Sequence, residues 1–442
     1  MTTTAPHLLG NFAPVPDELT VTDLPVTGTI PTELTGWYLR NGPNPRDAAS
    51  PHWFLGDGMV HGVRIEGGTA TAYRNRWVRT STFTDGARSR DEQGTPDLTA
   101  GSANTHVVRH AGRTLALVES AYPYEMSCQP GHELDTLGAY DFDGRLRTAM
   151  TAHPKTCPTT GELHFFGYAT TAPFLTYHRA DAQGELVISR PVDVGASTMM
   201  HDFALTSGHV VFLDLPILFD LARARSGAPG MPYTWTPEYG ARLGVLRRDD
   251  PFGAVRWFEI APCYVFHTLN AHEEADGQRL VLHVVRYDSL GDGVEVTGPA
   301  TLWRWTIDLA AGTVREEQQD ERPGEFPRID DRLAGLPTRY GHISTTDGPH
   351  GGAIHRYNLD QGTVTSHQFR DGQAPGEAAF AAADDQAGGP GWLMSFVYDA
   401  ATDGSDLVIL DADDLTAAPA ATIHLPRRVP AGFHGNWLPD TH

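Results

Sequence analysis

One recurring pattern constrains the fold of this chain more than any other feature of its sequence. It consists of a stretch of alternating apolar and polar residues, a tight turn with Asp or Gly, and a second alternating stretch. Period-two alternation on both sides of such a turn is typical of a β-hairpin. Seven copies occur, beginning at Val60, Tyr140, Tyr177, Val245, Trp305, Tyr357 and Leu407. The pattern predicts an all-β fold.

The spacing of the copies favours one all-β architecture. Their starts lie roughly 40 to 80 residues apart, wider than a plain propeller repeat, so some units must carry insertions. We therefore predict a seven-bladed β-propeller with a helical or loop cap over its centre, for which segments 218–242 and 321–341 are the candidates. A large β-sandwich has the same short strands and turns, and the pattern alone leaves it open.

The domain organisation follows from the same reading. Residues 1–35 are rich in Pro and Thr and are predicted to form an N-terminal arm. No Pro/Gly-rich linker divides the remainder into halves of different composition. We therefore expect residues 36–442 to form a single propeller domain with its cap insertions.

Charge and segment composition exclude several classes of partner. The formal net charge of -22 repels phosphate backbones, so nucleic acid is not an expected partner. The N-terminus lacks the basic and apolar regions of a secretory signal, and no apolar run is long enough for a membrane-spanning helix. Three cysteines without a CxxC pair fit a reducing compartment. These features predict a cytoplasmic protein, while the oligomeric state is not indicated.

A His or a Glu follows six of the seven hairpins. In a propeller, the strand after an outer hairpin is the innermost strand of the next blade, so these side chains should lie near the central axis. Four imidazoles meeting there would suit Zn, Cu, Fe or Ni, and carboxylates one layer out would accept the free ring N–H groups. The six residues are His153, His201, His267, Glu325, Glu377 and His434. They predict a metal site.

Other catalytic signatures are missing from the sequence. It contains no GxSxG elbow, GxxxxGK[ST] phosphate loop, HExxH helix or GxGxxG fingerprint. A nucleotide-driven or serine-nucleophile enzyme is therefore disfavoured.

Nine sequence blocks, in order from about Gly36 to Trp437, resemble those of a known family. They are NGPNP, WFLGDGMVHGVRI, ANTHVVRHAGRTLALVESAYPYEM, AHPKTCPTTGELHFFGY, MMHDFALT, FHTLNAHEE, EFPRID, GEAAF and FHGNW. The family is the carotenoid cleavage oxygenases, which include apocarotenoid oxygenases, plant epoxycarotenoid dioxygenases, stilbene-cleaving dioxygenases and the retinal pigment epithelium isomerase.

The resemblance implies a seven-bladed propeller with a helical dome and a non-haem Fe(II) held by four histidines without a carboxylate ligand. On matching motifs, the ligands are His153, His201, His267 and His434. The family's outer glutamates match Glu119, Glu325 and Glu377, which would orient His201, His267 and His434 respectively, and the assignment of Glu119 rests on the resemblance alone. Thr105 matches a position whose side chain crowds an open coordination site. Lys155, the only lysine of the chain, is expected to lock a turn together with Glu162.

The expected reaction uses dioxygen to split a conjugated C=C bond of an apolar carotenoid or apocarotenoid into two carbonyl products. Transient membrane contact is compatible with such a substrate. Three alternatives stay open: cleavage of a stilbene or phenylpropene by the same iron chemistry, a retinoid isomerase or hydrolase, and a propeller used only for binding. Stilbene cleavers of the family carry a Lys directly before the outer Glu, where this chain has Val118.

Overall fold

β-Strands are the predominant regular structure of this protein. The computed structural model describes residues 6–46, 50, 52–91, 95–275, 277–346 and 350–440. Within these ranges the chain forms seven sheets of four to six strands and two small hairpins. The α-helices of the same ranges are short, α1 (Ser81–Asp85) and α2 (Leu221–Ser226). The seven sheets match the seven blades of the predicted fold class, a β-propeller.

The chain forms two compact units, and the first comprises Met1–Tyr140, Arg328–Asp330 and Arg339–His442. Three of the seven sheets lie within it, and a fourth lies within it except for most of strand β26. In spatial order the four sheets are β1 (Leu19–Thr22), β5 (Thr69–Trp77), β4 (Gly58–Glu66), β3 (Gly36–Pro43) and β35 (Gly435–Pro439); β6 (His106–His110), β7 (Arg113–Leu117), β8 (Tyr124–Met126) and β9 (Thr136–Ala139); β26 (Glu325–Arg328), β27 (Tyr340–Thr345), β28 (Ala353–Asn358) and β29 (Thr363–Gln368); and β2 (Val26–Gly28), β34 (Ala421–His424), β33 (Gly404–Asp411), β32 (Gly391–Asp399) and β30 (Gln373–Pro375), with β31 (Ala379–Ala382) also paired to β32.

Both ends of the chain contribute strands to the sheets of the first unit. Strand β35 near the C-terminus pairs antiparallel with β3, so the sheet that begins the fold also ends it. From the N-terminal segment, β1 adds an edge strand beside β5 and β2 adds one beside β34. The division into an arm of residues 1–35 and a domain of residues 36–442 stays a prediction, and residues 1–5 lie outside the described ranges.

The second unit comprises Asp141–Pro327 and Asp331–Thr338. Three four-stranded sheets and both small hairpins lie in it. The sheets are β10 (Lys155–Thr156), β11 (Leu163–Tyr168), β12 (Leu175–Ala180) and β13 (Leu186–Val192); β14 (Phe203–Leu205), β15 (His209–Asp214), β18 (Ala241–Arg247) and β19 (Arg256–Ile260); and β20 (Tyr264–Glu274), β21 (Arg279–Tyr287), β24 (Thr301–Asp308) and β25 (Thr313–Gln318). The hairpins are β16 (Ile217–Phe219) with β17 (Tyr233–Trp235), and β22 (Leu290–Gly291) with β23 (Glu295–Val296).

Apolar side chains between neighbouring sheets hold the second unit together. Phe166 of β11 packs edge-on against Phe203 of β14, with ring centroids 5.5 Å apart, and Tyr177 of β12 packs against Phe212 of β15 in the same way at 5.9 Å. All four side chains are at most 1% exposed. Burying a side chain of this size contributes roughly 1.5–3 kcal/mol, so the packed faces fix the inner strands that carry the candidate ligands.

Six of the seven predicted hairpins are confirmed. They are β4–β5, β12–β13, β18–β19, β24–β25, β28–β29 and β33–β34. The hairpin predicted from Tyr140 is wrong, because Phe142 and Asp143 adopt positive φ angles of 54° and 56° and the next strand, β10, begins only at Lys155. The Phe142 ring is buried on Phe165, with centroids 5.3 Å apart. The alternating pattern there reflects burial of a connecting segment and not a strand.

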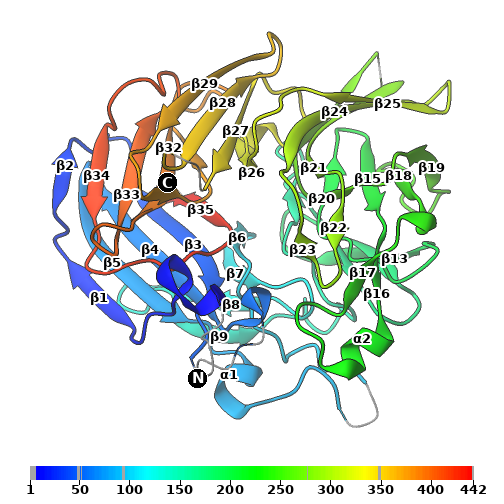
Figure 1. Cartoon of the computed structure of the whole chain (residues 1–442), viewed down its shortest axis with the longest axis horizontal. Coiled ribbons are helices and arrows are strands. Elements are labelled where there is room, and N and C mark those ends of the chain that lie inside the picture. The colour runs from blue at the N-terminus through cyan, green and yellow to red at the C-terminus, as the bar shows by residue number, and fades with distance from the viewer. Residues whose placement is uncertain are drawn as a thin grey trace. The chain divides into compact units, whose positions relative to one another are not determined.

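The two segments predicted to form the cap have different structures. Segment 218–242 contains α2 between strands β16 and β17, and the Asp220 side chain caps α2 by accepting from the Arg223 N–H at 2.9 Å (Figure 1). In segment 321–341 the assignment to the cap is wrong for residues 325–328 and 340–341, which belong to strands β26 and β27 of a propeller sheet, while Asp331–Leu333 forms a 3₁₀ helix. Among the described residues, no helix has the length and apolar character needed to cross a bilayer.

Candidate metal centre

Three of the predicted ligands lie at the inner strands of the three sheets of the second unit. His153 precedes β10 by two residues, His201 precedes β14 by two residues, and His267 lies within β20. The ring centroids of His153 and His201 are 4.6 Å apart, and those of His153 and His267 are 4.9 Å apart. His201 and His267 are separated by 5.2 Å. The register inferred from the hairpins thus brings three imidazoles from three blades together.

The spacing of two ring nitrogens fits a shared divalent ion. The Nε2 atoms of His153 and His201 lie 3.0 Å apart. Two nitrogens bound about 2.1 Å from one ion, with perpendicular bonds, would be about 3 Å apart. An all-imidazole donor set suits Fe, Zn, Cu or Ni, so the residues present fit a borderline transition metal.

Backbone and hydroxyl contacts link the segments that carry these histidines. The Thr151 hydroxyl accepts from the His153 N–H at 3.1 Å and donates to the His201 carbonyl oxygen at 3.1 Å. In β20, the register with β21 shifts on both sides of the pair His267–Thr268. Such bulges re-aim side chains in a strand, which accounts for the departure of the His267 side chain from regular alternation.

His267 is oriented by a carboxylate. Its Nδ1 donates to Oε2 of Glu325 at 2.6 Å, and the same oxygen accepts from the Phe326 N–H at 2.7 Å. A donor at Nδ1 leaves the Nε2 lone pair available for a metal. Burial and the nearby Glu325 carboxylate raise the pKa of Tyr287, so this hydroxyl stays protonated beside Glu325.

His434, in the first unit, has the same arrangement. Its Nδ1 donates to Oε1 of Glu377 at 2.9 Å, and the two side chains are only 4% and 3% exposed. The other carboxylate oxygen of Glu377 accepts from the Gly435 N–H at 2.8 Å and from Nη1 of Arg328 at 2.9 Å. Arg328 therefore compensates the negative charge of a buried carboxylate.

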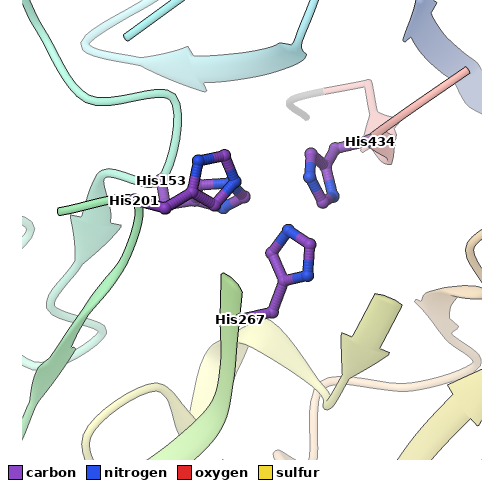
Figure 2. A group of neighbouring side chains, drawn as sticks. All are labelled: His153, His201, His267 and His434. Carbon is purple, nitrogen blue, oxygen red and sulfur yellow. The ribbon is translucent and has the colours of Figure 1, made fainter. Parts of the chain in front are cut away.

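All four predicted ligand histidines form one group. Their candidate ligand atoms lie within 4.8 Å of one another, and Figure 2 shows the four rings turned toward a common point. Three of the four residues are buried and His201 is partly buried. The group contains no carboxylate, which distinguishes its chemistry from the oxygen-rich sites that hold Mg²⁺ or Ca²⁺.

Aromatic side chains border the imidazoles. Phe266 meets the His201 ring edge-on at 5.4 Å, and the Phe326 ring lies 5.7 Å from that of His267. In the first unit, the residue before His434 is Phe433, whose ring lies 4.5 Å from that of Trp53 and 5.6 Å from that of Phe54. The surroundings of the ligands are therefore largely apolar.

The remaining predicted site residues are placed as follows. Thr105 is 8% exposed, its hydroxyl donates to Asn104 Oδ1 at 3.0 Å, and its carbonyl oxygen accepts from the His434 N–H at 3.1 Å. Glu119 follows β7 and is partly buried. The roles inferred for both from the resemblance, toward the open coordination site and toward His201, stay predictions.

Sequence reasoning missed two residues of this region. Lys155 does not lock its own turn: its Nζ lies 2.8 Å from Oδ1 of Asp202, the residue directly after His201. Glu162 alone fits that expectation, since it binds Thr160 and Arg248. Arg328 is the second missed residue. Two features of the sequence could have indicated the pair of Lys155 and Asp202: an acid directly after the predicted ligand His201, and the only lysine of the chain.

Comparisons with known proteins show which family the chain resembles. The family model described as "Retinal pigment epithelial membrane protein" matches residues 12–439. The chain is 40% identical to a carotenoid cleavage oxygenase of Mycobacterium tuberculosis, over 99% of this chain and 98% of that protein. A lignostilbene dioxygenase of Pseudomonas brassicacearum has a TM-score of 0.87 at 29% identity, covering 99% of both chains. Cobalt-substituted Synechocystis ACO, an apocarotenoid oxygenase, has a TM-score of 0.84 at 29% identity, covering 97% of both chains.

Proposed function

The chain belongs to the carotenoid cleavage oxygenase family, and on that premise we propose that it is a non-haem iron(II) dioxygenase. The proposed reaction splits a conjugated C=C bond of a carotenoid or apocarotenoid into two carbonyl products. The observation that carries the proposal is the group of His153, His201, His267 and His434. Two of these imidazoles donate to buried or partly buried carboxylates, the arrangement that tunes metal-binding histidines.

The four histidines would hold iron(II) through nitrogens not engaged by carboxylates. When bound, iron(II) supplies activation of dioxygen at the coordination positions that four protein ligands leave open. Glu325 and Glu377 fix the tautomer and orientation of His267 and His434 by accepting from Nδ1. By the resemblance, Glu119 would do the same for His201, and Thr105 would narrow access to one open position.

This chain's residues otherwise provide shape and an apolar environment. Oxygen insertion across a C=C bond needs no protein acid or base, so exclusion of water and orientation of the substrate are the tasks left to the protein. Phe266 and Phe326 lie against the imidazoles and offer the apolar contact that a polyene requires. Such contact contributes roughly 25 cal/mol for each Å² of apolar surface buried.

The polyene is favoured over a phenolic alkene by two side chains. Val118, at the position where stilbene cleavers of the family carry a lysine, is 7% exposed and offers only hydrocarbon. The single lysine of the chain, Lys155, is already paired with Asp202. A buried phenol oxygen without a partner would cost about 1–3 kcal/mol.

Stilbene cleavage is the second candidate, because a lignostilbene dioxygenase shares the fold over nearly the whole chain. Aerobic incubation of the iron-loaded protein with apocarotenals, 4-hydroxystilbenes and phenylpropenes, followed by mass spectrometry of the aldehydes, separates the two. We expect aldehydes from the apocarotenals. Aldehydes from the phenolic alkenes alone would assign stilbene cleavage instead. Absence of aldehyde from all three classes of compound would refute both functions.

A further inference from the structure

The carboxylate of Asp202 is almost completely buried and fully used. Its side chain is 1% exposed. Oδ1 accepts from the Phe203 N–H at 2.7 Å and lies 2.8 Å from Lys155 Nζ, while Oδ2 accepts from the N–H and the hydroxyl of Thr268, both at 2.8 Å. One carboxylate therefore has four donors from three segments of the chain.

Each of these segments carries a candidate ligand. Lys155 lies two residues after His153, Asp202 directly follows His201, and Thr268 directly follows His267. The segments enter three different sheets of the second unit, through β10, β14 and β20. Asp202 thus connects the three inner strands at the level of the three histidines.

Regular strand pairing does not fix these positions by itself. His153 and His201 precede their strands, and the register of β20 shifts on both sides of His267–Thr268. Because the ladder is irregular there, side-chain bonds hold this part of β20 beside the segment of His201. They are the two bonds from Thr268 to Asp202, the bond from the Thr268 hydroxyl to the Phe203 carbonyl oxygen at 3.2 Å, and that from the Tyr264 hydroxyl to the Met199 carbonyl oxygen at 2.7 Å.

The charge of Asp202 makes Lys155 indispensable to this arrangement. Removing the cationic partner of a buried carboxylate leaves an uncompensated charge, which is strongly destabilising unless the segments move apart. Lys155 is the only lysine of the chain, and its side chain is 22% exposed.

We propose that Asp202 is a positioning residue that sets the mutual spacing of His153, His201 and His267, and that the metal affinity of this site depends on the positive charge of Lys155. The inference rests on the proposed iron site and adds two residues that neither bind the metal nor bond to a ligand ring. It assigns Lys155 to the metal site and not to a surface turn.

A matched ion pair in the same unit provides the control. Asp214 is 0% exposed in its side chain and lies 2.9 Å from Nε of Arg242, whose side chain is 27% exposed. Asp214 lies in β15 and Arg242 in β18, and neither strand carries a candidate ligand. The variants Lys155→Met and Asp202→Asn are therefore compared with Arg242→Met and Asp214→Asn.

Three quantities are measured for each variant. Competition with a chelator gives the iron(II) dissociation constant. The other two are the visible spectrum of the cobalt(II)-loaded protein and the unfolding temperature of the metal-free protein. We expect Lys155→Met and Asp202→Asn to weaken iron binding about tenfold or more and to change the cobalt spectrum. The two control variants should keep both properties while losing comparable thermal stability. Unchanged iron affinity in the first pair, or equal losses in both pairs, would overturn the inference.

Chemical modification tests the same point on protein that has already folded with Lys155 in place. Acetylation of the metal-free wild type removes the Lys155 charge, whereas reductive methylation keeps it. The Lys155→Met protein is the control for modification of the N-terminal amine, which is the amine that remains when Lys155 is replaced. Iron affinity should fall on acetylation and not on methylation, and equal responses would contradict the proposal. A wild type that binds no iron would instead refute the proposed function itself.

Discussion

Nδ1 of His434 donates to Glu377 at 2.9 Å inside a site where both side chains are at most 4% exposed, and Arg328 lies 2.9 Å from the other oxygen of the same carboxylate. His267 and Glu325 form the corresponding pair at 2.6 Å, with Glu325 18% exposed. Glu377 is thus neutralised by a guanidinium, while Glu325 is bonded to the N–H of Phe326. The two carboxylates should therefore respond differently to the same substitution.

Glu325→Gln should keep the fold and weaken iron binding by about ten- to a hundredfold. An amide can still meet Nδ1 of His267, but it lacks the charge that makes the imidazole a better ligand. Chelator competition measures the affinity, and circular dichroism checks the fold. If Glu325→Gln matched the wild type while Glu325→Ala unfolded the protein, Glu325 would be scaffold only.

Glu377→Gln should lower stability as well as iron affinity. The substitution removes the carboxylate charge that pairs with Arg328, whose side chain is 10% exposed, and breaking a buried pair in this way costs about 3–5 kcal/mol. The free energy of unfolding of the metal-free protein is the measurement, with Glu325→Gln as the matched control. Equal stability of the two variants would show that Arg328 does not depend on Glu377.

Acid should destabilise the protein below about pH 6.5. Burial lowers the pKa of His178, His283 and His342 to about 3 in the folded protein, against an ordinary value of 6.5. The unfolded chain therefore binds these protons first, so stability is complete above pH 6.5 and falls as the pH drops toward 3. At pH 5 each histidine should lower the free energy of unfolding by on the order of 2 kcal/mol relative to pH 7.5.

Urea unfolding at pH 7.5 and pH 5.0 measures this loss. His342→Leu should reduce the difference between the two pH values by about the share of one histidine, on the order of 2 kcal/mol. A difference that is unchanged in His342→Leu would mean that this ring is not buried in its neutral form.

Substrate preference should follow from Val118. We expect kcat/KM for an apocarotenal to exceed that for a 4-hydroxystilbene by at least about tenfold, which requires only roughly 1.4 kcal/mol. Val118→Lys should shift the ratio toward the stilbene, whereas Val118→Met, of similar length without charge, should not. Faster turnover of the stilbene by the wild type would overturn the substrate assignment and leave the iron chemistry intact.

Much of the architecture could be predicted because hairpins and inner strands depend on local patterns. Alternation located six of the seven hairpins, and the residues after them, such as His201 and His267, meet because every blade repeats one register. The pattern failed at Tyr140, where the burial of Phe142 imitates a strand.

Contacts between distant segments could not be read from the sequence. Lys155 pairs with Asp202, which lies 47 positions further along the chain. Arg328 pairs with Glu377, which lies 49 positions further along. Such pairs depend on how side chains pack after the sheets have formed, and a charged residue alone gives no indication of its partner. The edge strands β1 and β2 were missed for the same reason, since their partners β5 and β34 lie far along the chain.

The most direct test of the account is the aerobic cleavage rate of one protein preparation reconstituted with iron(II) or with zinc(II), with the iron-treated His267→Ala variant as the control. The proposed function predicts about one iron per chain, aldehyde formation from an apocarotenal with iron only, and neither bound iron nor product in His267→Ala. Equal rates with zinc, or full iron occupancy and activity in His267→Ala, would contradict it.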